Sequence, residues 1–199
     1  MSSEEKPRTT PPTVLRSRRL ALENSKWKVY YDEIEGNGVT VSNYIVLGGQ
    51  TQRPDFVTGA CVLPIYQDKI VLMRAYRHPM AEFGWETARG FVDEGEEPAQ
   101  AAMRELAEET GLGCAPEHLT FLGLVAPEVS TFIAKGALFL AEHCYPVSER
   151  DQDEPGLGAI FYFTLPEALA LAESGEIQDV CTLIALYRFA LRKQIVQNS

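Results

Sequence analysis

The chain has 199 residues, of which 45% are hydrophobic and 23% are charged, and its formal net charge is -10. This composition excludes a wholly disordered chain, and the length suits one globular domain with a short extension. The acidic charge argues against a nucleic-acid partner, and no apolar run reaches the ~20 residues of a membrane span.

Four cysteines, Cys61, Cys114, Cys144 and Cys181, lie far apart in the sequence and form no C-x-x-C pair. A disulfide framework or a zinc ribbon is therefore not expected, and buried, reduced thiols are the default state. The amino terminus lacks the apolar core of a signal peptide. These features together predict a cytoplasmic protein.

The amino-terminal quarter of the chain is expected to form a tail and a small sheet. Residues 1–13 are polar and rich in Pro, Ser and Thr, which predicts a flexible tail. Residues 14–50 have the pattern of strands, including a hairpin from Trp27 to Leu47 with its turn at 35–38. An isolated hairpin is only marginally stable, so this subsidiary sheet is expected to pack on a larger body or on a partner chain.

Residues 51–199 are expected to form the main domain, in which strands and helices are mixed. Apolar and β-branched runs predict strands at 57–66, 69–76, 85–88, 119–125, 136–142 and 159–163. Helical periodicity predicts helices at 97–110, 165–174 and 179–193. Pro98 suits a first helical turn and Gly111 a helix end. Mixed strands with helices on their faces indicate an α/β sandwich.

The helix predicted at 97–110 carries Glu105, Glu108 and Glu109, at a spacing that places three carboxylates on one face. Like charges at this spacing destabilise a helix slightly, and hard cations such as Mg2+ prefer carboxylate oxygens. The face opposite the acids is expected to anchor the helix in the core through Ala102, Met103 and Leu106. The pattern therefore predicts a rigid metal-binding platform.

Arg104 adjoins these acids and can grip a carboxylate with two hydrogen bonds, so we expect it to fix Glu96 or a neighbouring acid on the helix. An acidic helix face is usually only solvated. Here, however, the spacing resembles the signature of the Nudix hydrolase family: Gly, five residues, Glu, seven residues, then Arg-Glu-apolar-any-Glu-Glu-any-Gly-apolar. The signature positions hold Gly90, Glu96, Arg104, Glu105, Leu106, Glu108, Glu109, Gly111 and Leu112.

Between about residues 27 and 191 the chain also resembles the ADP-ribose pyrophosphatase branch of this family. The segments that carry this resemblance are Arg74–Pro79, Trp85-Glu86, Pro127, Gly175–Asp179 and Thr182-Leu183. The resemblance implies a Nudix α/β/α sandwich with a mixed sheet, and a homodimer whose amino-terminal strands embrace the partner. It also implies hydrolysis of the pyrophosphate bond of ADP-ribose or a related nucleoside diphosphate sugar, which gives a nucleoside monophosphate and a sugar phosphate.

The same resemblance assigns roles to the acidic residues. Glu105 and Glu109 would be direct ligands of Mg2+ or Mn2+, and Glu108 and Glu96 would support the site directly or through water. The backbone carbonyl of Arg89 is a further candidate ligand. A general base would come from the acidic loop at 148–156. Its first candidate is Glu154, ahead of Asp153 and Glu149, with an ordinary solvated loop as the alternative.

Four residues are candidates for substrate contacts. Arg77 would hold a phosphate, Glu86 would fix the ribose or the base, and Trp27 would stack on adenine across the dimer. A surface charge is the alternative for Arg77, and a core or interface position for Trp27. Arg89 departs from the family pattern, because Leu-Pro-Ala-Gly reads Thr-Ala-Arg-Gly at 87–90. Its positive charge could contact phosphate or another part of the substrate.

Several alternatives remain open on the sequence alone. GDP-mannose, ADP-glucose or a dinucleoside polyphosphate could replace ADP-ribose as the substrate. A non-catalytic sensor of nucleotide sugars is a different class of function that the same fold could serve, although a sensor has no need of the full set of acids. An RNA-decapping or RNA-binding role is disfavoured by the net charge of -10.

Overall fold

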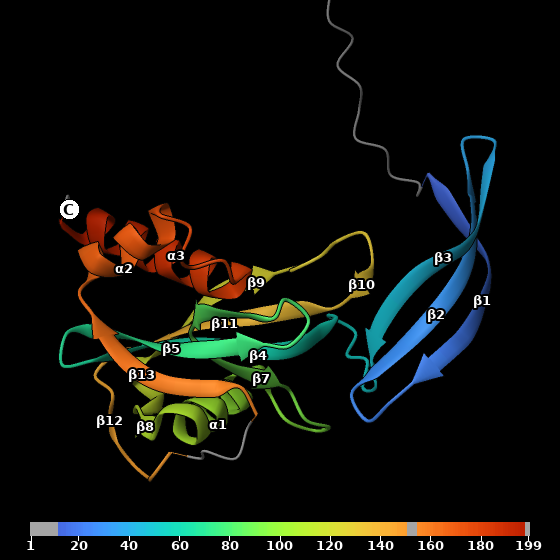
Figure 1. Cartoon of the computed structure of the whole chain (residues 1–199). Helices are drawn as coiled ribbons and strands as arrows, with labels where there is room; N and C mark the ends of the chain where they lie inside the picture. The colour runs from blue at the N-terminus through green and yellow to red at the C-terminus, as the bar shows by residue number, and fades with distance from the viewer. Residues whose placement is uncertain (1–11, 151–154, 198–199) are drawn as a thin grey trace, which may run out of the picture. The chain divides into compact units, whose positions relative to one another are not determined.

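The structure of the chain, a computed structural model, describes residues 12–150 and 155–197 (Figure 1). The chain divides into two compact units. The first consists of Met1–Gln50 with Glu128–Ile133, and the second of Thr51–Pro127 with Ala134–Ser199. Each unit has its own sheet.

The first unit contains a four-stranded sheet in the order β1 (Thr13–Glu23), β2 (Trp27–Gly36), β3 (Val39–Gly49) and β10 (Phe132–Ile133). The first three strands are antiparallel, and β10 pairs with β3 in parallel. Asn37 and Gly38 both have positive φ, at 53° and 76°, as a tight two-residue hairpin turn requires. The predicted hairpin is therefore confirmed. Thr13 already belongs to a strand, whereas residues 1–11 of the predicted tail lie outside the described residues.

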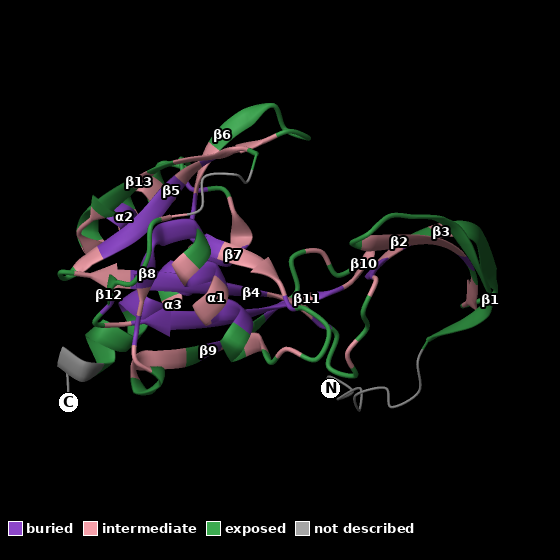
Figure 2. Ribbon diagram, turned by 90° about the horizontal axis from the view of Figure 1, so that it is seen from below, coloured by how far each residue is buried: buried purple, intermediate pink, exposed green. Residues whose placement is uncertain are grey.

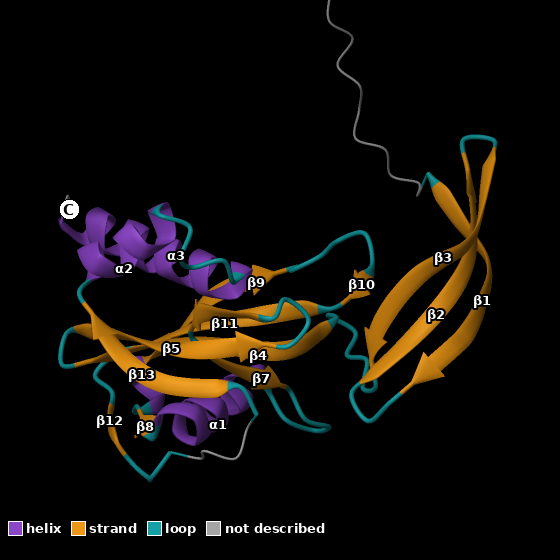
Figure 3. Cartoon of the chain, viewed as in Figure 1, coloured by secondary structure: helices purple, strands orange, loops and turns teal. Residues whose placement is uncertain are grey.

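The second unit contains a seven-stranded mixed sheet between two helical layers (Figure 3). Its main path runs β13 (Leu157–Phe163), β5 (Lys69–Arg77), β4 (Val57–Tyr66), β11 (Lys135–Ala141) and β9 (Leu119–Val125). Among the neighbouring strands on this path, β4 and β11 are parallel and the other pairs are antiparallel. Helix α1 (Pro98–Thr110) covers one face, and α2 (Leu165–Glu173) and α3 (Val180–Gln197) cover the other. The predicted α/β/α sandwich is confirmed. Short elements complete the unit: β8 (Leu112–Gly113), β12 (Tyr145–Pro146) and the 3-10 turn Pro116–His118.

The strand predicted at 85–88 is replaced by two strands, β6 (Glu82–Glu86) and β7 (Ala88–Phe91). They pair with different neighbours, β6 with β5 and β7 with β4. The chain changes neighbour at Thr87, which is buried. The Thr87 N–H donates to the hydroxyl of Thr182 at 3.0 Å, and the Thr87 hydroxyl donates to the carbonyl of Val62. These long-range bonds have no local sequence signal, which explains why the prediction missed the break.

The core of the second unit lies on both faces of β4 (Figure 2). Ala60 and Val62 belong to the cluster under α1, while Cys61 and Leu63 belong to the cluster under α2 and α3. A strand buried on both faces reads as a continuous apolar run rather than an alternating one. This accounts for the apolar segment from which the strand was predicted. No helix within the described ranges is both long and apolar enough to cross a membrane.

All four cysteines are buried and free. Burial raises the pKa of Cys114, and it raises the pKa of Cys144 to about 12. A hydrogen bond between Cys61 and Cys181 raises the pKa of Cys61 and lowers that of Cys181. The thiolate reacts only where the reagent can reach it, so buried thiols react slowly in the native protein, including Cys181 with its lowered pKa.

We therefore expect slow labelling of the native, unreduced protein by a thiol-specific disulfide reagent at pH 8. After unfolding in guanidinium, all four cysteines of the sequence should react. The released thiolate chromophore measures both the rate and the stoichiometry. Fewer than four reactive thiols in the unfolded protein would reveal a disulfide and contradict the free-thiol assignment.

Candidate functional site

Helix α1 holds the predicted acidic residues, and both of its ends are fixed. Pro98 occupies the first turn, and the N–H of Glu97 donates to the side chain of Gln100 at 2.9 Å. At the other end Gly111 adopts φ 71°, and its N–H donates to the carbonyl of Ala107 at 2.9 Å. The predicted roles of Pro98 and Gly111 are confirmed. The last turn of α1 therefore presents its side chains from a defined backbone.

The acids of α1 differ in their exposure, although their spacing was expected to place all three on one face. Glu105 and Glu109 are 7% and 3% exposed, whereas the side chain of Glu108 is 50% exposed. The buried arc of the helix mixes acids with apolar residues and consists of Ala101, Ala102, Glu105, Leu106, Glu109 and Thr110. Met103 is only half-buried. Ala102 and Leu106 anchor the helix in the core as expected. The expected separation of acidic and apolar faces is not found, because β7 covers the side of the helix that carries Glu105 and Glu109.

Strand β7 passes directly over these two buried carboxylates. The backbone N–H of Arg89 donates to Oε2 of Glu109 at 2.8 Å. A Cβ added to Gly90 would lie 1.9 Å from Oε1 and 2.2 Å from Cδ of Glu105. Any side chain at position 90 would displace the Glu105 carboxylate, so glycine permits the close approach of β7. Gly95, with φ 79°, is the loop glycine that uses its conformational freedom.

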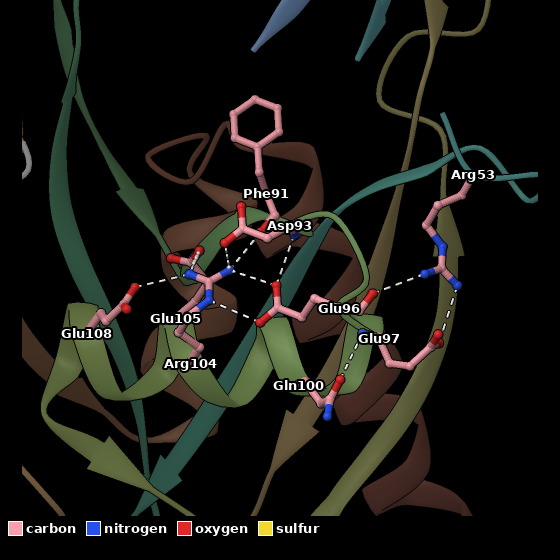
Figure 4. Close-up of polar contacts among 9 residues, drawn as sticks. All are labelled: Arg53, Phe91, Asp93, Glu96, Glu97, Gln100, Arg104, Glu105 and Glu108. Atoms are coloured by element: carbon pink, nitrogen blue, oxygen red, sulfur yellow. Dashed lines mark hydrogen bonds and ion pairs between the residues drawn. The ribbon is translucent and has the colours of Figure 1, made fainter. Parts of the chain in front are cut away.

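Arg104 connects the loop before α1 to the acids on the helix (Figure 4). Its Nε and Nη2 each lie 3.1 Å from an oxygen of Glu96, so the predicted grip on Glu96 is present. Its Nη1 lies 2.6 Å from Glu105 Oε1 and 3.1 Å from Glu108 Oε2, and its Nη2 donates to the carbonyl of Phe91 at 2.8 Å. The bonds from Arg104 lower the pKa of Glu96. Arg104 therefore joins three of the predicted metal-site acids.

Arg53 fastens the other side of the same loop and was not predicted. Its Nη1 donates to the carbonyl of Glu96 at 3.1 Å, and its Nη2 lies 3.3 Å from Oε2 of Glu97 (Figure 4). Arg53 lies 43 residues before Glu96, in a segment without a motif. No local pattern could have linked it to the loop.

The residues predicted to contact substrate form a chain of ion pairs. Arg77 places Nε and Nη2 at 2.8 and 2.5 Å from the two oxygens of Glu86, which is buried. Arg89 places Nη2 at 2.7 Å from Glu86 Oε2 and Nη1 at 2.6 Å from Asp179 Oδ1. The structure therefore brings Arg77, Glu86 and Arg89 together and adds Asp179. Their roles toward substrate stay predictions.

The remaining predictions concern Trp27 and the acidic loop at 148–156. Trp27 lies at the start of β2 in the first unit, where its ring centroid is 5.7 Å from that of Phe132. Glu154 and Asp153 lie outside the described residues, and Glu149 is exposed. Backbone hydrogen bonds are formed on both sides of residues 151–154. The N–H of Val147 donates to the Gly111 carbonyl at 2.9 Å, and the N–H of Tyr76 donates to the Gly156 carbonyl at 2.7 Å.

The donor set at α1 suits a hard divalent cation. Carboxylate oxygens are the preferred ligands of Mg2+. Two carboxylates of α1 are buried, and Gly90 leaves room for that of Glu105. In residues 12–150 and 155–197, no three His, Cys, Asp or Glu side chains already converge as a closed metal cage. Instead Arg104 and the N–H of Arg89 engage Glu105 and Glu109. The residues thus fit a cation, which would replace part of these contacts.

Comparison with known proteins agrees with the geometry of this site. The family model of the NUDIX domain matches residues 55–191. The chain is 32% identical over 123 residues to the ADP compounds hydrolase NudE of Escherichia coli (strain K12), covering 61% of this chain and 65% of that one. It is 31% identical over 130 residues to the ADP-ribose pyrophosphatase of Bacillus subtilis (strain 168), covering 65% of this chain and 69% of that one. The chain thus spans about two thirds of these relatives.

A solved structure supports the same fold. The crystal structure of an ADP compounds hydrolase superposes with a TM-score of 0.76, covering 96% of this chain and 98% of that chain at 23% sequence identity. At this identity the likeness concerns the fold. The family match covers well over half of the chain, and the acids of its signature gather on α1 and the loop before it. The chain belongs to the NUDIX domain family.

Proposed function

We propose that this protein hydrolyses the pyrophosphate bond of ADP-ribose or a related nucleoside diphosphate sugar and requires Mg2+ or Mn2+. The observation that carries the proposal is the burial of Glu105 and Glu109 against β7, where Gly90 leaves room for the Glu105 carboxylate and the N–H of Arg89 holds Glu109. Burial of two carboxylates is costly unless they are neutralised, and a diphosphate substrate brings its own need for cations. The names of NudE and the Bacillus pyrophosphatase support an ADP-containing substrate.

Glu105 and Glu109 would hold the divalent cation directly, with Glu108 and Glu96 in support and the backbone carbonyl of Arg89 as a further ligand. A bound cation supplies positive charge that neutralises the diphosphate and acidifies an attacking water. The protein's own part is to hold the acids still. Arg104 does so for Glu96, Glu105 and Glu108, and the backbone N–H of Arg89 does so for Glu109.

In the proposed reaction a water oxygen bonds to one phosphorus while the bond from that phosphorus to the bridging oxygen breaks. The other phosphate leaves with its sugar, and a general base takes the proton of the water. Glu154 remains our first candidate for the base, followed by Asp153 and Glu149. The described residue Val147, which precedes this loop, donates its N–H to the carbonyl of Gly111 at the end of α1. Arg77 and Glu86 remain the candidates for phosphate and ribose contacts.

A panel of nucleotide sugars tests the proposal. Purified protein is incubated with ADP-ribose, ADP-glucose, GDP-mannose and a dinucleoside polyphosphate, each with Mg2+, with Mn2+ and with excess chelator. We expect AMP and ribose 5-phosphate from ADP-ribose, no turnover with chelator, and recovery when Mg2+ is restored. Tight binding of a nucleotide sugar without turnover of any substrate would support the non-catalytic sensor and contradict the enzyme.

We further propose that the protein is a homodimer formed through its first unit. Strand β1 is exposed along its whole length, and Val14, Leu15, Leu20 and Leu22 are 46–60% exposed. An exposed strand with several apolar side chains is a typical pairing surface.

Sedimentation equilibrium should give twice the 22.1 kDa chain mass. The double variant Leu20→Glu with Leu22→Glu should have the mass of the monomer. A wild-type monomer would contradict dimerisation and, with it, stacking of Trp27 across the dimer. A cytoplasmic location stays a prediction from the cysteines.

A further inference from the structure

Arg53 lies in a short turn that is anchored to the central sheet. The N–H of Phe56 donates to the carbonyl of Arg53 at 3.0 Å, and the N–H of Lys135, at the start of β11, donates to the carbonyl of Phe56 at 2.8 Å. Oδ1 of Asp55 accepts from the N–H of Val57, the first residue of β4, at 3.0 Å and lies 3.3 Å from Nε of Arg53. The turn therefore fixes Arg53 relative to the first residues of β4 and β11.

From this turn the guanidinium of Arg53 reaches the acidic loop before α1 (Figure 4). Nη1 donates to the backbone carbonyl of Glu96 at 3.1 Å, and Nη2 lies 3.3 Å from Oε2 of Glu97. The side chain of Glu97 is 68% exposed, and an exposed ion pair contributes little. The bond to the Glu96 carbonyl is part-buried. The hold of Arg53 on the loop therefore rests mainly on the Glu96 carbonyl.

Glu96 is bonded through its carbonyl, its N–H and its side chain. Its N–H donates to the carbonyl of Asp93 at 3.1 Å, and its Oε2 accepts from the N–H of Asp93 at 3.0 Å. These two bonds close the loop on itself, but they do not attach it to another element. Arg104 attaches the side chain of Glu96 to α1, and Arg53 attaches its backbone to the turn before β4. The loop is thus held between the helix and the sheet.

The position of Glu96 matters because Arg104 divides its guanidinium between this carboxylate and the acids on α1. Nε and Nη2 of Arg104 contact Glu96, while Nη1 contacts Glu105 and Glu108. A guanidinium is planar and rigid, so a shift of the Glu96 carboxylate would turn the whole group and move Nη1 relative to Glu105. The chain of contacts that begins at Arg53 therefore ends at Glu105, a proposed metal ligand.

We propose that Arg53 is a positioning residue that holds the backbone of Glu96 and so fixes the acids of α1 for a divalent cation. The inference rests on the proposed metal-dependent function and adds to it a residue outside the Nudix signature. Charge alone predicts the opposite effect, because a positive side chain beside the loop repels a cation, and its removal would tighten metal binding. The sign of the change therefore distinguishes positioning from simple electrostatics.

Arg53→Gln tests the inference through the binding of Mn2+ without substrate, followed by electron paramagnetic resonance. We expect the affinity to fall by about tenfold, as when a partner of a metal ligand is removed. Unchanged or tighter binding would overturn the inference. Arg188→Gln is the matched control, because Arg188 also donates to backbone carbonyls, those of Leu122 and Leu124 in β9, at 3.0 and 3.3 Å. It should keep the wild-type affinity, and an equal loss in both variants would mean general destabilisation and would also count against Arg53.

A double-variant cycle with Glu96→Gln checks that Arg53 acts through Glu96. If it does, the two single substitutions disturb the same contact chain and their affinity losses overlap. The double variant should then bind Mn2+ about as weakly as Glu96→Gln alone. Fully additive losses would show that Arg53 acts by another route and would overturn the inference.

Glu109→Gln in the same titration separates this inference from the proposed function. Mn2+ binding that is lost in Glu109→Gln but unchanged in Arg53→Gln would sustain the metal site and overturn the role of Arg53. Absence of Mn2+ binding by the wild type would overturn both. If Mn2+ affinity falls in Arg53→Gln as expected, but the wild type turns over no nucleotide sugar, the positioning role stands and only the proposed hydrolysis fails.

Discussion

Glu109→Gln should lower turnover of the preferred nucleotide sugar by about a hundredfold or more, because a metal-ligand contact contributes several kcal/mol and each ~1.4 kcal/mol is a factor of ten. The glutamine oxygen can still accept from the N–H of Arg89, which donates to Glu109 in the wild type. Loss of one buried negative charge beside Glu105 also removes repulsion between the two carboxylates. The fold should therefore persist, and stability without metal should be equal or slightly higher.

Two measurements check this expectation. Steady-state rates at saturating Mg2+ report the loss of turnover. Thermal unfolding with and without Mn2+ reports the loss of the site, since a ligand at a hundred times its dissociation constant stabilises the native state by ~2.7 kcal/mol. Glu173→Gln, which removes an exposed negative charge on α2 and leaves an oxygen that can still accept from the Tyr187 hydroxyl, is the control for a simple change in charge and should behave like the wild type. Near wild-type rates in Glu109→Gln would refute the metal assignment.

Gly90→Ala should produce a loss of similar size through geometry rather than charge. The added Cβ would lie 1.9 Å from Oε1 of Glu105, so the carboxylate must move. That oxygen is also the one held by Nη1 of Arg104 at 2.6 Å. A displacement of about 1 Å at a reacting site can cost ~100-fold in rate. We therefore expect kcat and Mn2+ affinity to fall together, with little change in secondary structure by circular dichroism.

Gly84→Ala is the matched control for this substitution. Gly84 lies in β6, and a Cβ added there meets no atom within 4 Å. Its replacement should change the free energy of unfolding by less than about 0.5 kcal/mol, as for other unstrained surface sites. If Gly90→Ala retained wild-type kcat and Mn2+ affinity, the close approach of β7 to Glu105 would have no functional consequence, and the proposed placement of the metal-binding acids would be wrong.

Local features could be predicted from the order of the amino acids alone. The ends of α1 follow from Pro98 and Gly111, whose preferences act within one helical turn. The hairpin turn at Asn37-Gly38 needs positive φ at both residues, which this pair adopts readily. The spacing of Glu96, Arg104 and the helix acids places charged groups within one loop and two turns, so the Arg104–Glu96 contact was predictable.

The burial of those acids and the contacts that hold them depend on how the chain packs. The helix does not specify which side a strand will cover, and β7 covers Glu105 and Glu109 because it pairs with β4 across a sheet assembled from distant segments. The ion pair between Arg89 and Asp179 joins residues 90 positions apart and has no period or motif in the chain. Helix periodicity and capping depend on neighbours a few residues away, whereas burial and charge pairing depend on contacts that exist only after the sheet has formed.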